Sequence, residues 1–337
     1  MSPHATDPDA STSHTDYPSY TSPISQRLPT QGPGHSPHRF REFELNGRVF
    51  VVTGGAQGLG LAFVEALVEA GGIVYCLDRQ KEPTASFSET QGRVAAEFGG
   101  TLHYRQVDVQ DAKLLDEVIA SIAEEHSRLD GLIANAGIQY TKPALEYPAD
   151  EVSRVRIIKT MEFEIALILL SDDERQLQRC LLLGRELYVH LTVFTMVSAN
   201  VIEGAKQMIK YKTPGNMVLI GSMSGFNANK GLLSSVYNAS KAAVIQLGRN
   251  LSMEWARAVD GKPIRVNVLC PGNIITPMVE NDFKNDPSLR KTWEDANMLG
   301  RISEPKEYRG AILFLLSDAS SFMTAGSLVI DGGYTAW

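Results

Sequence analysis

The sequence has only three cysteines among its 337 residues, and it has neither a long apolar run nor an excess of basic residues. Cys76, Cys180 and Cys270 lie far apart without metal-ligand or redox-motif spacing, so we interpret them as reduced core thiols and expect no metal site. The apolar runs are too short to span a bilayer. A net charge of -7, with acidic and basic residues interspersed, argues against nucleic acid as a partner. These absences predict a cytoplasmic globular protein.

The N-terminal segment differs from the rest of the chain. Seven of the sixteen prolines and four of the seven histidines fall within residues 1–40, where aliphatic side chains are scarce. Such a segment cannot bury enough apolar surface to offset the entropy lost on ordering. We therefore predict a disordered tail over residues 1–42 and one folded domain over residues 43–337.

A glycine-rich turn follows the first predicted strand, which covers Arg48 to Thr53. The turn contains Gly54, Gly58 and Gly60, and apolar residues at helical spacing begin directly after it. A strand that enters a glycine-rich turn at a helix N-terminus is typical of a pyrophosphate site, because the backbone can come close and free amides face the anion. A plain turn has the same glycines, but the flanking strand and helix favour the binding site.

Acidic residues end the next predicted strands. The strand Gly72 to Leu77 ends in Asp78, where a carboxylate can accept both hydroxyls of an adenosine ribose and repel a 2′-phosphate. This favours NAD over NADP, although Arg79 leaves NADP open. Asp108 follows a third strand, placed either to cap the next helix or to touch the adenine. Strands that alternate with helices predict a parallel, doubly wound α/β sheet.

A tyrosine and a lysine lie four residues apart in the second half of the chain. Tyr237 and Lys241 begin a segment whose apolar residues recur every four positions up to Trp255, which places both on one side of a helix. An ammonium close to a phenol lowers its pKa and lets it transfer a proton at neutral pH. The pair also occurs on ordinary solvated helices, but Ser222 stands fifteen residues earlier at a strand end. The combination of the Tyr237–Lys241 pair with this serine favours a catalytic site.

Taken together, these motifs resemble the short-chain dehydrogenase/reductase family. The motifs are Thr53-Gly54-x-x-x-Gly58-x-Gly60, Asn135-Ala-Gly137, Ser222, Tyr237-x-x-x-Lys241, Pro271-Gly272 and Asp331-Gly-Gly333. The resemblance implies a single Rossmann-type domain with a seven-stranded parallel sheet, assembled as a homodimer or homotetramer. It also implies hydride transfer between a nicotinamide cofactor and an alcohol or carbonyl. The amino-acid sequence around Ser222 and Tyr237 is most similar to that of fungal polyol and ketose enzymes of the sorbose-reductase and mannitol- or arabinitol-dehydrogenase kind.

The resemblance also implies roles for individual residues. Tyr237 would be the general acid/base, Lys241 would lower its pKa and bind the nicotinamide ribose, and Ser222 would hold the substrate oxygen. The remaining cofactor contacts are implied for Gly54, Gly58, Leu59, Gly60 and Asp78 on the adenosine diphosphate half, Asp108 and Asn135 at the adenine and its ribose, and Thr276 at the carboxamide.

One segment departs from the family pattern. Members of the family have an asparagine in the helix before the serine that corresponds to Ser222, and this asparagine belongs to a proton relay. Here His190 falls at about that position. It lies within an irregular insertion at about residues 152–194. The insertion is either a genuine lid or interface, or a stretch that does not belong to the mature protein. A disrupted relay would leave a non-catalytic dinucleotide-binding scaffold or sensor, the alternative to an oxidoreductase acting on a sugar alcohol or ketose.

Overall fold

The structure is a computed structural model that describes residues 40–97, 99–137, 197, 200–229, 234–276, 279–280, 283–284 and 286–337. The predicted tail up to residue 39, the irregular segment 152–194, His190 and Cys180 lie outside the described residues. The first described element is a short 3-10 helix, η2 (Arg41–Phe43). In the described part of the chain, no helix is long and apolar enough to cross a membrane.

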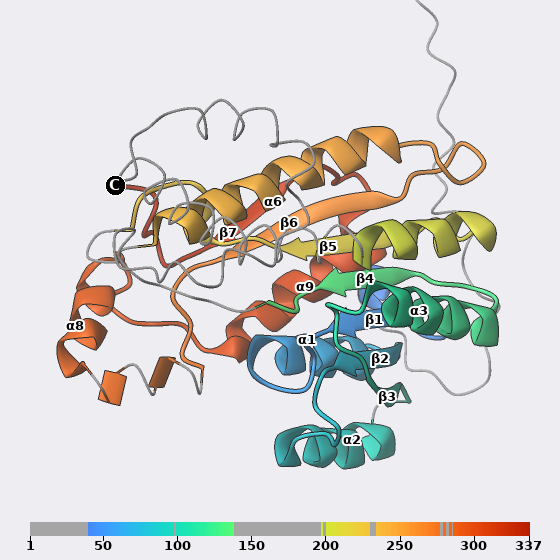
Figure 1. Ribbon diagram of the computed structural model, residues 1–337, viewed down its shortest axis with the longest axis horizontal. Coiled ribbons are helices and arrows are strands. Elements are labelled where there is room, and N and C mark those ends of the chain that lie inside the picture. The colour runs from blue at the N-terminus through green and yellow to red at the C-terminus, as the bar shows by residue number, and fades with distance from the viewer. Residues whose placement is uncertain are drawn as a thin grey trace, which may run out of the picture. The chain divides into compact units, whose positions relative to one another are not determined.

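Seven parallel strands form one sheet in the order β3-β2-β1-β4-β5-β6-β7 (Figure 1). The strands are β1 (Val49–Thr53), β2 (Ile73–Asp78), β3 (Thr101–Gln106), β4 (Gly131–Ala134), β5 (Asn216–Ile220), β6 (Arg265–Pro271) and β7 (Ser327–Ile330). The register pairs Val51 with Tyr75 of β2 on one side and with Leu132 of β4 on the other. The predicted doubly wound, seven-stranded α/β domain is confirmed.

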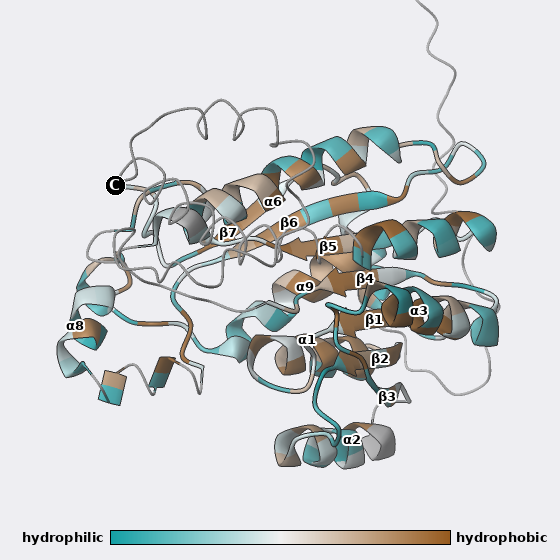
Figure 2. Cartoon of the chain, in the orientation of Figure 1, coloured by the Kyte–Doolittle hydropathy of each residue, from teal (hydrophilic) through white to brown (hydrophobic). Residues whose placement is uncertain are grey.

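Helices cover both faces of this sheet because its strands are apolar on both faces. On β1, Val49 and Val51 face one apolar cluster, while Phe50 and Val52 face the other. The first cluster packs under α3 (Ala112–His126), helical residues 200–210 and α6 (Ser235–Glu254); the second packs under α1 (Gly58–Glu69), α2 (Ala85–Glu97) and α9 (Arg309–Leu316). Figure 2 shows the hydrophobic residues concentrated in the strands and the hydrophilic ones on the outer sides of the helices.

The strand order reverses direction between β1 and β4. From β1 the chain runs outward through β2 to β3, and it then returns to place β4 on the opposite side of β1. In open parallel sheets, ligands bind beyond the carboxyl ends of the strands at such a reversal. The short elements η4 (Met223–Gly225), η5 (Pro305–Tyr308) and η6 (Asp318–Ser320) complete the connections. Every predicted site residue lies at this edge of the sheet or in a helix that starts there.

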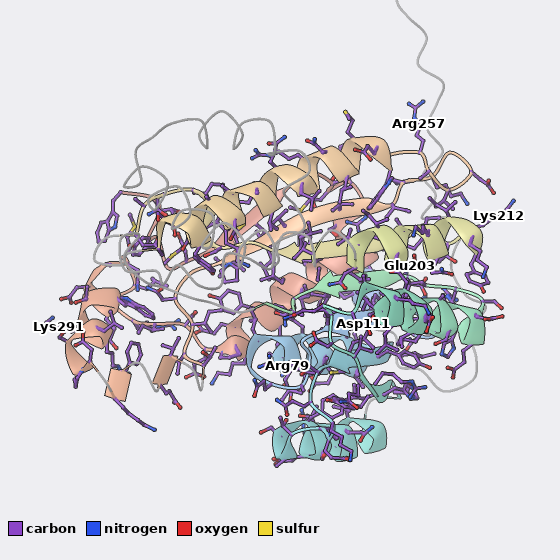
Figure 3. The ribbon with its side chains drawn as sticks, viewed as in Figure 1. Arg79, Asp111, Glu203, Lys212, Arg257 and Lys291 are labelled. Atoms are coloured by element: carbon purple, nitrogen blue, oxygen red, sulfur yellow. The ribbon has the colours of Figure 1, made fainter. Side chains whose placement is uncertain are left out.

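The residues from Met278 to Gly300 are largely polar in sequence, which predicts a mobile substrate lid. In the structure this lid segment includes a helix and most of a small apolar cluster. In α8 (Pro287–Asp295), Trp293 is 8 % exposed and packs edge-on against Phe283, with ring centroids 5.4 Å apart. Val279 belongs to the same cluster, which is separate from the two clusters on the sheet. On the outer side, Lys291 points away from the domain (Figure 3). The lid segment therefore combines exposed polar side chains such as Lys291 with an apolar cluster of its own.

Candidate functional site

The glycine-rich turn leads from β1 into an open helix N-terminus. Gly54 and Gly58 have φ angles of +65° and +56°, which side chains other than glycine rarely adopt. The residue before α1, Gln57, makes no side-chain hydrogen bond to the helix, so its side chain leaves the N–H groups of the first turn available as hydrogen-bond donors. At Gly58 the nearest atom to an added Cβ would be the Thr276 methyl group, 4.0 Å away. The turn thus offers free amides and open space, and both suit a pyrophosphate.

Gly60 lies where α1 crosses the end of β1. A Cβ on Gly60 would lie 2.1 Å from the carbonyl oxygen of Gly54, so only glycine fits there. Asn135, which follows β4, braces the same turn: its amide nitrogen donates to the carbonyl oxygens of Gly54 at 2.9 Å and Thr53 at 3.2 Å. The structure therefore gives Asn135 a positioning role on the turn, beside the cofactor contact that the family resemblance implies.

Two acidic residues at strand ends take different positions. Asp78, half-buried at the end of β2, accepts a hydrogen bond from the backbone amide of Ala56 in the glycine-rich turn at 3.2 Å. Asp108 is exposed and accepts from the amide of Gln110, while the cap of α3 is Asp111, which accepts from Leu114 at 3.0 Å. The capping alternative for Asp108 is therefore wrong, because the aspartate three residues later takes that position.

Ser222, Tyr237 and Lys241 line one cavity of about 200 Å³. Ser222 follows β5 and is 8 % exposed, and its side chain hydrogen-bonds Tyr237 on the first turn of α6. Lys241 lies one helical turn further on; its Nζ is 5.7 Å from the centroid of the Tyr237 ring and donates to the carbonyl oxygen of Ile220 at 2.9 Å. The three polar groups that the sequence singles out thus come together beyond the end of β5.

Burial dominates the titration of this pair. It raises the pKa of the Tyr237 phenol, against a smaller lowering by the hydrogen bond with Ser222. Burial also lowers the pKa of Lys241 from 10.5 to about 8. The expected lowering of the Tyr237 pKa by Lys241 is therefore not found, because desolvation favours the neutral form of both groups. The site holds a neutral phenol, which is the form that donates a proton.

We expect Lys241→Met to stabilise the fold at pH 7 while it removes a polar group from the site. The folded-state pKa of Lys241 lies below its unfolded value, so the buried charge costs stability below pH 8, and wild-type stability recovers as pH rises from about 8 to 10.5. After allowing for the lost hydrogen bond, we expect a gain of about 2 kcal/mol at pH 7. Chemical denaturation at pH 7 and pH 10 measures it.

The matched control is Lys291→Met, which removes an exposed lysine paired with Asp295 on the outer side of α8. Its effect on stability at pH 7 should be much smaller than that of Lys241→Met, because solvent screens an exposed ion pair. A Lys241→Met variant that is less stable than wild type at pH 7, or whose advantage does not shrink by pH 10, would contradict the burial cost assigned to this ammonium.

The cavity has further polar and apolar lining that the sequence analysis did not single out. Leu59 and Thr276, both predicted as cofactor contacts, line it; Ser224, Asn229 and Trp293 also line it and were not predicted. Ser224 carried a weak signal, since it lies two residues after Ser222 in the same Gly-Ser-Met-Ser-Gly turn. The other two come from a loop and from the lid segment, where no periodicity marks them. Across the described residues, no group of histidine, cysteine, aspartate or glutamate side chains could hold a metal ion.

Two family models match the chain. The model described as short chain dehydrogenase matches residues 48–163, and the model described as enoyl-(acyl carrier protein) reductase matches residues 188–335. Between them the models include the glycine-rich turn, Ser222, Tyr237 and Lys241.

Individual proteins match over most of their length. A short chain dehydrogenases/reductase named notP' from Aspergillus versicolor is 34% identical over 296 residues, covering 88% of this chain and 89% of the relative. A D-arabinitol 2-dehydrogenase (ribulose-forming) from Scheffersomyces stipitis is 32% identical over 305 residues, covering 88% and 96%. The crystal structure of a short-chain type dehydrogenase/reductase from Mycobacterium marinum superposes with a TM-score of 0.70 at 28% identity, covering 88% and 99%.

Proposed function

The chain belongs to the short-chain dehydrogenase/reductase family, and from this membership we propose that it interconverts a sugar alcohol and the corresponding ketose. One observation carries the proposal: Ser222, Tyr237 and Lys241 line a single cavity beyond the end of β5. The same cavity includes Leu59 of α1, so it reaches the open N-terminus of that helix. The similarity to a D-arabinitol 2-dehydrogenase supports a polyol as the substrate.

Each polar residue of the cavity has its own role in the proposed reaction. Ser222 and Tyr237 hold the reacting oxygen, and the Tyr237 hydroxyl donates its proton to that oxygen when a ketone is reduced. Lys241, which is fixed by the carbonyl of Ile220, places a positive charge beside the phenol when it is protonated. A nicotinamide dinucleotide, when bound, supplies or accepts the hydride. Gly54, Gly58, Leu59 and Gly60 would hold its phosphates, Asp78, Asp108 and Asn135 the adenosine side, and Thr276 the carboxamide.

The assay for this function is turnover at the absorbance band of reduced nicotinamide, with a panel of polyols and ketoses. We expect oxidation of at least one polyol and reduction of its ketose by the same enzyme. A wild-type protein that binds the dinucleotide but turns over no member of the panel would overturn the polyol assignment.

We propose NAD as the preferred cofactor because Asp78 presents a carboxylate beside the glycine-rich turn. Asp78→Asn keeps an acceptor for the Ala56 amide but removes the charge that repels a 2′-phosphate. We expect the ratio of the two dissociation constants to shift toward NADP by about tenfold or more, which corresponds to a like-charge term of at least 1.4 kcal/mol. Fluorescence titration with NADH and NADPH measures both constants.

The control for Asp78→Asn is Glu82→Ala, which removes an exposed negative charge from the same loop. This variant should leave the ratio within about twofold, because an exposed charge is screened by solvent. If wild type binds NADPH more tightly than NADH, the proposed preference is wrong and Arg79 becomes the residue to test.

We also propose that the protein works in the cytoplasm as a homo-oligomer. Cys76 and Cys270 are buried free thiols, which suits a reducing compartment. Ile202 and Ile209 on helical residues 200–210 and Met253 on α6 are exposed apolar side chains that a second copy would cover. Light scattering of the purified chain tests the assembly state, and a monomer at micromolar concentration would contradict it.

A further inference from the structure

Asn229 has one polar atom that finds no partner. Its amide nitrogen donates to the Ser224 hydroxyl at 2.7 Å, which fixes the orientation of the carboxamide. Its Oδ1 is buried and has no hydrogen-bond partner among the described residues. A buried carbonyl oxygen without a hydrogen bond destabilises the fold, because it has lost its hydration and gained nothing in return. Such an atom is expected to gain a partner in the working state of the protein.

The unpartnered oxygen belongs to a residue of the catalytic cavity. Asn229 and Ser224 line the cavity together with Ser222 and Tyr237. Ser224 is the direct neighbour of the reacting centre, because its backbone amide donates to the Ser222 hydroxyl oxygen at 3.1 Å. Asn229 is thus one hydrogen bond beyond Ser224 and two beyond Ser222. This places its carboxamide beside the reacting oxygen rather than on it.

The loop that carries Asn229 is held at its base. Asn238 on α6 donates from its amide nitrogen to the carbonyl oxygen of Asn227 at 2.9 Å, and Ser234 donates to Asn238 Oδ1 at 2.8 Å. These bonds tie the loop to the first turn of the helix that carries Tyr237. The carboxamide of Asn229 is therefore positioned relative to the catalytic phenol before any ligand arrives.

The charge of the cavity limits what can bind there. Among the described residues its lining includes no carboxylate, and the one cation among them, Lys241, already donates to a backbone carbonyl. An acceptor oxygen such as Asn229 Oδ1 repels a carboxylate or phosphate and takes a hydroxyl donor. The lining therefore fits a neutral ligand with an O–H group next to the reacting carbon.

We propose that Asn229 and Ser224 form a subsite for a second hydroxyl group, on the carbon adjacent to the one that is oxidised or reduced. That hydroxyl donates to Asn229 Oδ1, and its oxygen accepts from the Ser224 hydroxyl. The substrate class is then a vicinal diol and its α-hydroxyketone, as in a polyol and ketose pair. The inference rests on the proposed function and narrows it, because it names the group by which a polyol is told from a simple secondary alcohol.

The test compares kcat/KM for 2,3-butanediol with kcat/KM for 2-butanol, which differ by the adjacent hydroxyl. We expect wild type to prefer the diol, and Asn229→Leu to reduce that preference by about tenfold or more, the value of one hydrogen bond left unmade. Asn229→Asp, which keeps an acceptor oxygen, should retain the preference to within about threefold. NADH affinity and the melting temperature of each variant show that the fold is intact.

Asn227→Leu is the matched control. Asn227 lies in the same loop and also has a buried, unpartnered Oδ1, but it does not line the cavity. Its replacement should leave the preference for the diol unchanged. A wild-type enzyme without a preference for the diol, or equal preferences in wild type and Asn229→Leu, would overturn the subsite and leave the oxidoreductase in place. Failure of wild type to oxidise either alcohol or any polyol would instead overturn the proposed function, and the subsite with it.

Discussion

Replacing Tyr237 by phenylalanine is expected to lower kcat by about 10²- to 10⁴-fold, the usual contribution of a positioned general acid or base. The change removes one oxygen atom from the cavity and keeps the ring that packs beside Lys241. Dinucleotide affinity should stay within about threefold, because the phosphate-binding turn at the start of α1 is unaltered. Steady-state turnover of the best polyol and fluorescence titration with NADH measure the two quantities on the same preparation.

A matched variant separates loss of a catalytic proton from loss of a buried hydroxyl. Tyr75→Phe removes a phenol on β2 that hydrogen-bonds His126 at 2.8 Å and does not line the cavity. It should reduce stability without reducing kcat. If Tyr237→Phe turns over substrate at the wild-type rate, the phenol is not the acid, and the scaffold or sensor reading that the irregular segment 152–194 raised would gain support.

Gly60→Ala should reduce dinucleotide affinity by about ten- to a hundredfold. The added Cβ would lie 2.1 Å from the Gly54 carbonyl oxygen and 2.6 Å from the amide nitrogen of Asn135. Neither the turn nor the helix can move without displacing the first-turn amides of α1, and overpacking of this kind costs about 1 to 3 kcal/mol. NADH titration measures the affinity, and thermal unfolding shows how much of the cost falls on the fold.

The control glycine is Gly92, which lies exposed in α2 where an added Cβ would meet nothing within 4 Å. Gly92→Ala should leave affinity unchanged and stabilise the protein by about 0.5 to 1 kcal/mol, because alanine is the better helix former. Wild-type affinity in Gly60→Ala would mean that the turn does not hold the dinucleotide.

The strands of the fold could be predicted because each is an apolar run that ends in turn residues. The predicted strands Arg48 to Thr53 and Gly72 to Leu77 differ from β1 and β2 by one residue at one or both ends, and the apolar runs Gly131 to Ala134, Asn216 to Ile220 and Ser327 to Ile330 predict the bounds of β4, β5 and β7. Helix α2 was not singled out, because it buries little more than Phe87 and Val94 and shows no apolar period. The sequence predicts a single helix from Pro305 to Leu316, but this stretch begins as the 3-10 helix η5 and becomes α9 only at Arg309. Local patterns thus placed the buried strands better than the exposed helix.

The candidate site could be predicted only where its geometry is local. Tyr237 and Lys241 are one helical turn apart, so their spacing alone placed them on one side of α6. Asn229 and Trp293 line the same cavity, but they lie in a loop and in the lid segment, whose positions no sequence pattern predicts. The titration of the pair was also misjudged, because desolvation depends on the surrounding fold and outweighs the effect of a neighbouring charge.

The separate packing of Trp293, Val279 and Ile302 has a consequence for how this enzyme can change over time. Substitutions of Val279 and Trp293, which line the cavity, alter one wall of it without touching the two clusters that hold the sheet together. Their cost in stability should be additive with the contributions of those clusters and should not weaken the packing inside them, since distant sites contribute independently to stability. The chain can therefore acquire new substrates by drift in a short stretch near its C-terminal end, while the machinery that handles the nucleotide is inherited intact.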